Sequence, residues 1–130
     1  MKKNIFVFGF LIVLFGTAII QYKASLPKKT IEIKQYLSAV QTITIDGVKN
    51  TKKERAILGT TALQLLTSSH KVVTKGENKN AFITEIDARA ANQDAREFWA
   101  FYVNGTQATV GAGAYIIKNN DTIEWKIETY

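Results

Sequence analysis

The segment that decides the fold reads TIEWKIET and spans residues 122–129. Apolar and charged residues alternate in it, so Ile123, Trp125 and Ile127 point to one side of an extended chain and the charged residues between them to the other. One face of this strand is therefore expected to be buried and the other to face water. This pattern is typical of a mixed or antiparallel sheet that is covered on one side.

A second strand is predicted just upstream, where the sequence FWAFYV at residues 98–103 runs into Asn104-Gly105. Asn-Gly suits a two-residue turn, because both positions tolerate a positive φ. Alternation divides the aromatic strand between two faces. Trp99, Phe101 and Val103 share one face, and Phe98, Ala100 and Tyr102 share the other.

The first half of the chain carries a hairpin signal and a short helix signal. Residues 41–45 alternate polar with β-branched side chains and run into Asp46-Gly47, and residues 48–57 supply the returning strand. Thr60 or Thr61 can then cap a helix whose apolar face includes Ala62, Leu65 and Leu66. Because this helix is short, it needs to bury its leucines against a sheet in order to form.

Further strands are predicted at residues 71–75 and 82–86, and residues 88–96 form a polar loop. Residues 30–39 fit either a strand or a helix, and we favour a helix or an extended stalk there. Five or more strands with one helix predict a small α+β domain with two layers and a mixed sheet.

The N-terminus carries a membrane-targeting signal. Residues 5–20 contain no ionisable group, and the span from Ile5 to Tyr22 is about 27 Å long as a helix, close to the thickness of a hydrocarbon core. The alternative is a cleavable signal peptide with Gly16 and Ala18 before the cleavage site, but Ile19 and Ile20 extend the apolar run past it. We expect an uncleaved anchor.

This interpretation divides the chain into four parts: a cytoplasmic N-terminus at 1–4, a transmembrane signal-anchor helix at 5–22, a membrane-proximal linker at 23–39 and a domain at 40–130. The C-terminal domain is expected to be extracellular, on the surface of a bacterial cell. Because the chain has no cysteine, the domain has to be stabilised by packing rather than by disulfides.

The charge of the exported part argues against a nucleic-acid partner. From Ala24 onward the chain has 14 basic and 11 acidic residues, a net charge of +3, and its densest basic stretches are Lys28-Lys29 and Lys52–Arg55. Such short stretches are typical of solvated strands and turns. An anionic wall polymer or a lipid headgroup would be a more available partner outside the membrane.

Three motifs in the final third resemble a known family. They are FWAFYVNG at residues 98–105, VGAGAY at 110–115 and NDTIEW at 120–125, and GTTALQLL at 59–66 and FITEI at 82–86 fit the same pattern. Together they resemble the transcobalamin C-terminal-like family, also catalogued as domain of unknown function 4430. The resemblance covers residues 40–130 and implies a β-grasp-like fold.

The resemblance also implies a ligand. In transcobalamin and intrinsic factor, the corresponding domain closes over cobalamin that is bound mainly to a helical barrel. No such barrel is predicted in this chain, so a partner protein would have to supply the rest of a cobalamin site. Gly113-Ala114 stands where the family often has an acidic residue, and Asn120 replaces the glycine of its usual Gly-Asp turn.

These considerations give a set of candidate ligand-binding residues on the aromatic strand and in the glycine-containing loop that follows it. The candidates are Trp99, Tyr102, Gly111, Gly113 and Tyr115. Aromatic rings with polar tips suit a half-wet ligand, and glycines allow a partner to approach the backbone closely. Trp99 and Trp125 also fit a purely structural role in the core.

Catalysis and metal binding have weak support in the sequence. His70 is the only histidine and follows the predicted helix, and Glu85 and Asp87 share a strand face on which solvation explains them. We therefore expect a binding module, not an enzyme, with no cofactor. Its partner would be a small molecule such as a corrinoid, together with a surface protein or a transporter. A structural or adhesive surface domain without a small ligand is the alternative.

The anchor makes a direct prediction about location. Because residues 5–20 are apolar and lack a good cleavage site, full-length protein should stay with membranes after carbonate extraction, and external protease should digest it from Ala24 onward in intact cells. Recovery of most of the protein from the medium, with a new N-terminus near Ile19 or Ser25, would contradict the anchor.

Overall fold

A computed structural model describes residues 31–130 of the chain. The predicted anchor at residues 5–22 lies outside the described residues and stays a prediction. In the part that is described, none of the helices has the length and apolar character needed to cross a bilayer.

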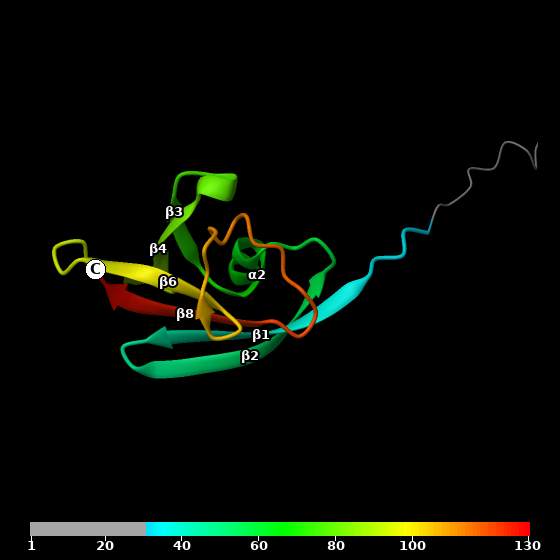
Figure 1. Ribbon diagram of the computed structural model, residues 1–130, viewed down its shortest axis with the longest axis horizontal. Coiled ribbons are helices and arrows are strands. Elements are labelled where there is room, and N and C mark those ends of the chain that lie inside the picture. The colour runs from blue at the N-terminus through cyan, green and yellow to red at the C-terminus, as the bar shows by residue number, and fades with distance from the viewer. Residues whose placement is uncertain (1–30) are drawn as a thin grey trace, which may run out of the picture. The chain divides into compact units, whose positions relative to one another are not determined.

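The larger sheet has five strands (Figure 1). Their spatial order is β2 (Val48–Ile57), β1 (Tyr36–Ile45), β8 (Thr122–Thr129), β6 (Glu97–Val103) and β7 (Thr106–Gln107). The sheet is mixed, because β1 and β8 run parallel while the other neighbours are antiparallel. The α+β class and the mixed sheet that the sequence predicts are thus confirmed.

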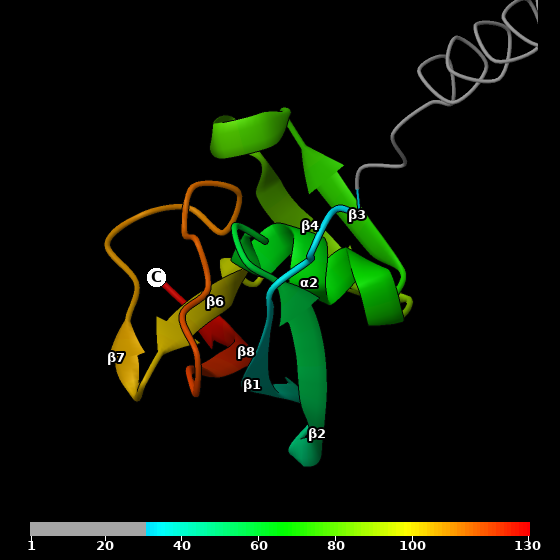
Figure 2. The same ribbon diagram turned by 90° about the vertical axis from the view of Figure 1, so that its right-hand side faces the viewer.

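A smaller sheet and the single α-helix complete the domain. The smaller sheet has the order β3 (Val72–Lys75), β4 (Phe82–Ile86) and β5 (Arg89–Ala90), with the 3-10 helix η1 (Asn78–Asn80) between β3 and β4. The helix α2 (Ala62–Ser69) lies over one face of the larger sheet, and the smaller sheet lies on that same side (Figures 1 and 2). Side chains on the other face of the larger sheet point away from the helix.

The turn of the first hairpin forms where the sequence predicts it, but the first strand of the hairpin begins earlier than predicted. Asp46 and Gly47 both have positive φ, as a two-residue hairpin turn requires. Strand β1 starts at Tyr36, so the preference for a helix or stalk at residues 30–39 is wrong for Tyr36 to Ala39. Pairing decides this segment, because Tyr36 lies opposite Ile57 and the hairpin register continues without a break.

Helix α2 is short, and its first turn is fixed by contacts on two sides. Thr61 and Gln64 form a capping box, as the candidate cap predicts. The N–H groups of Ala62 and Leu63 donate to the backbone oxygens of Tyr115 and Ala112. Segment 112–115 thereby satisfies donors that a helix of eight residues would otherwise expose at its N-terminus.

Trp125 is the centre of the core. It is fully buried, its ring stacks on Phe101 with centroids 4.6 Å apart, and its Nε1 donates to Gln41 Oε1 at 3.2 Å. Ile123 and Ile127 lie on the same side of β8, which confirms the predicted buried face. Leu65 and Leu66 of α2 belong to the same cluster of buried residues.

The position of Trp125 predicts a large loss of stability on truncation. Trp125→Ala should lower the free energy of unfolding by roughly 3–5 kcal/mol, because it empties the space of a large buried ring. Denaturant unfolding of a shortened protein, residues 34–130, measures this loss. Trp125→Phe is the matched control, since it keeps an aromatic ring in place and should cost less. A melting temperature of Trp125→Ala within a few degrees of the parent would contradict the buried face.

Candidate functional site

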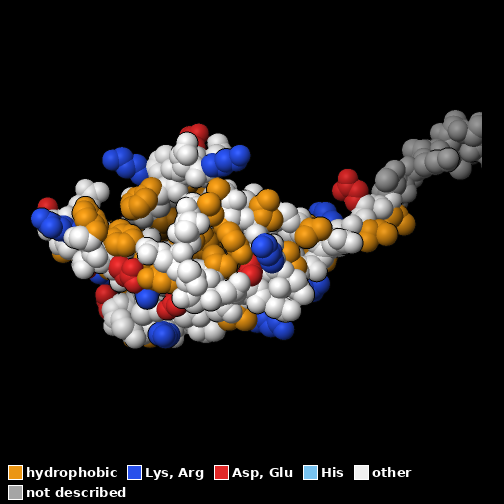
Figure 3. Space-filling view, in the orientation of Figure 1, with side chains coloured by type: hydrophobic (Ala, Val, Ile, Leu, Met, Phe, Trp, Pro, Cys, Tyr) orange, Lys and Arg blue, Asp and Glu red, His pale blue; other side chains and the backbone are white. Residues whose placement is uncertain are grey.

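A small groove opens on the domain surface between β4, β6 and the loop after β7. Its volume is about 180 Å³, and its walls include Phe82 of β4, Phe98 of β6 and Val110 of the loop. Phe82 and Val110 are 51% and 48% exposed, so the groove presents apolar side chains to solvent. Figure 3 shows hydrophobic side chains gathered on this side of the molecule, over β6 and the segment after β7. We call this feature the β4–β6 groove.

Trp99 lines the β4–β6 groove but contributes little exposed surface. Its side chain is 4% exposed, and its Nε1 donates to the backbone oxygen of Arg89 at 3.1 Å. The structure thus places Trp99 mainly in the core, as the base of the groove. Its polar tip is already bonded to the protein.

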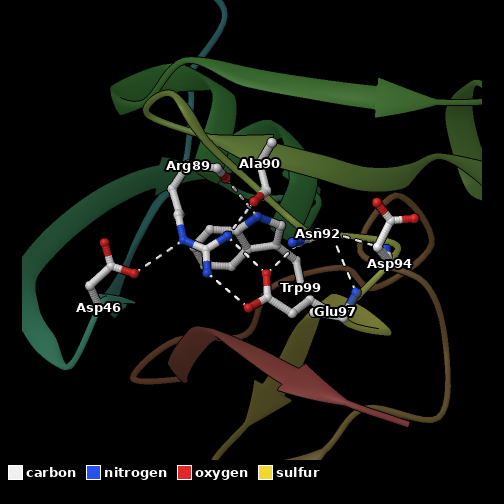
Figure 4. A network of polar contacts seen from close by, with 8 residues as sticks. Asp46, Arg89, Ala90, Asn92, Asp94, Glu97 and Trp99 are labelled. Atoms are coloured by element: carbon white, nitrogen blue, oxygen red, sulfur yellow. Dashed lines mark hydrogen bonds and ion pairs between the residues drawn. The ribbon is translucent and has the colours of Figure 1, made fainter.

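Arg89 holds the neighbourhood of Trp99 in place (Figure 4). Its guanidinium donates two hydrogen bonds to the Glu97 carboxylate, at 3.0 and 3.1 Å, and one to Asp46 at 3.1 Å. These bonds from Arg89 lower the pKa of Glu97, with help from the backbone N–H of Asn92. The network connects the β1–β2 turn to β5 and β6, so the Trp99 side of the groove is pre-formed.

Tyr115 also uses its polar tip within the protein. Its hydroxyl donates to Asp121 Oδ2 at 2.8 Å, and its ring packs edge-on against Phe101 with centroids 5.9 Å apart. Burial, followed by the hydrogen bond to Asp121, raises the pKa of Tyr115 to about 12. Tyr115 therefore stays neutral, and its contacts with Phe101 and Asp121 hold the end of the 110–115 loop in place.

Asp121 collects the polar contacts of this region. It is 4% exposed, and besides the Tyr115 hydroxyl it accepts from the Lys118 N–H at 2.8 Å and from Asn104 Nδ2 at 2.9 Å. Burial acts to raise the pKa of Asp121, but these hydrogen bonds outweigh it, so the pKa is lowered. The carboxylate is fully partnered and is a structural anion rather than a free acid.

The two glycines approach another part of the same chain. A Cβ on Gly113 would overlap the carbonyl oxygen of Asn78, and one on Gly111 would lie 3.1 Å from the carbonyl oxygen of Lys79. The loop therefore packs its backbone against η1, which explains why these positions have no side chain. Gly111 borders the groove, whereas Gly113 is not among its lining residues.

Tyr102 lies on the opposite face of β6 from Trp99. Its hydroxyl donates to Glu128 Oε1 at 2.8 Å, and Lys126 Nζ lies 4.2 Å from its ring centroid. The hydrogen bond to Glu128 raises the pKa of Tyr102. The five candidate residues thus do not share one surface: Trp99 and Gly111 line the groove, Tyr115 and Gly113 support the adjacent loop, and Tyr102 faces away.

Sequence reasoning missed the side chains that give the groove its exposed apolar surface, Phe82 and Val110. Their exposure depends on how β4 approaches β6, and these strands belong to different sheets. No local sequence pattern predicts this approach of β4 to β6. The one available signal is the alternation of residues 82–86, which puts Phe82 on the opposite face of the strand from Ile83.

His70 and Asp87 form a pair at the end of α2. His70 Nδ1 lies 2.6 Å from Asp87 Oδ2, and the other oxygen of Asp87 accepts from the Lys71 N–H at 3.0 Å. Despite some burial, these contacts lower the pKa of Asp87. The His70–Asp87 pair thus fixes the β4–β5 turn. Residues 31–130 contain no group of three or more His, Cys, Asp or Glu side chains placed to hold a metal ion.

Comparison with known proteins identifies the family. The family model described as domain of unknown function (DUF4430) matches residues 59–129, more than half of the chain. This chain is a member of the DUF4430 family. Comparison with curated proteins finds no match.

Solved structures share the fold of this DUF4430 chain. The crystal structure of haptocorrin in complex with Cbi is similar with a TM-score of 0.64 and 20% identity; the match covers 78% of this chain and 27% of haptocorrin. A Ruminococcus gnavus protein to which metal binding is attributed matches with a TM-score of 0.62 and 16% identity, over 75% of this chain and 99% of that one. The chain thus spans about a quarter of the haptocorrin chain.

The Tyr115–Asp121 bond predicts a stability effect with a defined pH dependence. Tyr115→Phe should lower the free energy of unfolding by roughly 1.5–3 kcal/mol near pH 7, because it removes a donor from a buried carboxylate. Since folding lowers the pKa of Asp121, the stability contributed by the charged form is complete above about pH 3.9 and is lost as the pH falls through the folded-state pKa. The cost of the substitution should therefore shrink in acid.

Urea unfolding at neutral and acidic pH measures this difference. Tyr102→Phe is the matched control, because it removes a hydroxyl that is bonded to the more exposed Glu128. Equal losses for both variants at pH 7, or a Tyr115→Phe cost that grows in acid, would contradict the role given to Asp121.

Proposed function

We propose that this protein is a single-pass, membrane-anchored extracellular binding module, with residues 5–22 as the anchor and the β4–β6 groove as its ligand site. The ligand is a corrinoid-like or another small molecule that presents an apolar edge to the groove, and a partner protein completes the site. The helix α2 across one face of the mixed sheet supports the β-grasp-like arrangement that the resemblance implies.

The observation that carries this proposal is the likeness to haptocorrin, whose structure is a complex with Cbi. The shared fold accounts for 27% of the haptocorrin chain, so the rest of that protein has no counterpart in the match. In addition, the β4–β6 groove of about 180 Å³ is smaller than the roughly 300–1,000 Å³ of most small-molecule pockets. A domain with this groove covers one side of a ligand, which supports a partner on the other side.

The groove has the chemistry expected for such a lid. Phe82 and Val110 present apolar surface at its rim, and the Trp99 Nε1 beneath them is already paired. An apolar ligand edge can therefore displace water there without leaving a buried donor or acceptor unpaired. This arrangement favours binding over catalysis, and the haptocorrin structure that shares the fold is a complex with Cbi.

A structural or adhesive role is the second candidate, and the open face of the large sheet favours it. Strand β2 is an edge strand and carries Lys49, Lys53 and Arg55 on the face that points away from α2. Thr42 and Thr51 share a hydroxyl hydrogen bond of 2.9 Å on the same face. A polar surface with three cations along an edge strand suits a surface protein or an anionic wall polymer.

Calorimetry separates the two candidates. Titration of residues 34–130 with cobalamin or cobinamide should give weak binding, because one small groove buries little of so large a ligand. Phe82→Ala should weaken that binding by about tenfold, as expected for the loss of an aromatic anchor. Val73→Ala is the matched control, since Val73 is also 51% exposed but lies on β3, away from the groove.

Two results would decide against the ligand module. Absence of heat at millimolar ligand would favour the structural or adhesive role. Equal weakening by Phe82→Ala and Val73→Ala would show that binding, if present, does not use the β4–β6 groove.

A further inference from the structure

A second groove lies at the end of the domain where β1 begins. Its volume is about 700 Å³, and it is lined by residues from three separate segments of the chain. Tyr36 comes from the start of β1, Leu58 from the β2–α2 connection, and Ile116 and Lys118 from the segment before β8. Figure 1 shows these three segments meeting at that end of the sheet. We call this feature the end groove.

The end groove exposes large apolar side chains. Leu58 is 63% exposed, Tyr36 58% and Ile116 56%. Adjacent backbone is held by hydrogen bonds, since Leu58 N–H donates to Gln35 O at 2.9 Å and Ile117 N–H donates to Thr60 O at 3.0 Å. The exposed side chains therefore project from backbone that is held by hydrogen bonds, and they form a stable apolar surface.

Two cations lie beside this apolar surface. Lys118 lines the groove, and the Arg55 guanidinium lies 4.7 Å from the centroid of the Tyr36 ring. Among the described residues that line the groove, none is acidic. Figure 3 shows hydrophobic and basic side chains, with an acidic one among them, at the end where β1 begins. Apolar side chains flanked by Tyr, Lys and Arg are the composition of surfaces that lie at a lipid interface.

The position of the end groove in the chain selects a membrane as its occupant. Tyr36 lines the groove and is separated from Tyr22, the end of the proposed anchor, by a connection of 13 residues, 23–35. Fully extended, that connection spans about 45 Å at most. If residues 5–22 are inserted in a bilayer, the domain is confined close to it, and even a weak affinity for lipid is strengthened by the tether.

We propose that the end groove docks on the anionic lipid surface of the membrane that holds the anchor, with Tyr36, Leu58 and Ile116 in the interface and Lys118 and Arg55 at the headgroups. This proposal rests on the membrane anchoring proposed above. The end groove and the β4–β6 groove share no lining residue, so docking leaves the ligand groove open.

The absence of cysteine allows a clean test with the full chain. Single-cysteine variants Leu58→Cys and Asn50→Cys are labelled with the same environment-sensitive fluorophore and reconstituted into vesicles of phosphatidylglycerol and phosphatidylcholine. Asn50 is an exposed residue of β2, roughly 24 Å along the strand from Ile57. The label at 58 should be quenched by spin-labelled lipid and protected from iodide, and the label at 50 should show the reverse.

Substitutions test whether the groove itself makes the contact. Adding Ile116→Glu to the Leu58→Cys protein should restore iodide quenching, because it places a carboxylate in the interface. Val73→Glu is the matched control, since Val73 is similarly exposed but lies on β3, and it should leave the label at 58 protected. Salt of about 1 M should weaken protection by screening Lys118 and Arg55.

Three results would overturn the proposal. Equal iodide quenching at positions 58 and 50 would show that the anchored domain does not dock. Protection of position 58 from iodide without quenching by lipid would show that protein, such as a second copy, covers the groove instead. Failure of the protein to float with the vesicles would overturn the anchor, and this docking with it. Because flotation is measured separately from quenching, the two failures can be told apart.

Discussion

The buried carboxylate of Asp121 makes the hydrogen bonds that hold three segments of this domain together. Its side chain accepts hydrogen bonds from Asn104, Tyr115 and the backbone of Lys118, and its backbone oxygen accepts from the Val40 N–H at 2.8 Å. One residue thus connects the β6–β7 turn, the 110–118 segment and β1. Because the charge is buried and fully partnered, each bond lost would leave part of it uncompensated.

The 110–118 segment in turn shapes both grooves. Its carbonyl groups at Ala112 and Tyr115 bind the N-terminus of α2, and its glycines pack against η1. Val110 then forms a wall of the β4–β6 groove, while Ile116 and Lys118 line the end groove. The two grooves of different chemistry therefore rest on one irregular segment, which hydrogen bonds to Asp121 and α2 hold in place.

Local patterns in the sequence predicted the elements but not how distant ones meet. The alternation in residues 122–129, the Asp46-Gly47 and Asn104-Gly105 turns and the Thr61 cap each carry their own physical signal, and each is confirmed. The β4–β5 turn was missed, because Ala88 adopts a positive φ of 67° without a glycine, next to Asp87 held by His70. The roles of Gly113 and Phe82 depend on packing between segments far apart in sequence, which no local pattern encodes.

The central claim is that ligand binds at the β4–β6 groove rather than on the open face of the sheet. Nuclear magnetic resonance of isotope-labelled protein, residues 34–130, titrated with cobinamide tests this claim residue by residue. The account predicts shifts concentrated at Phe82, Val110 and Gly111, with Tyr102 and Lys126 on the opposite face unchanged. Shifts confined to Tyr102, Lys126 and strand β2, or no shifts at millimolar ligand, would contradict it.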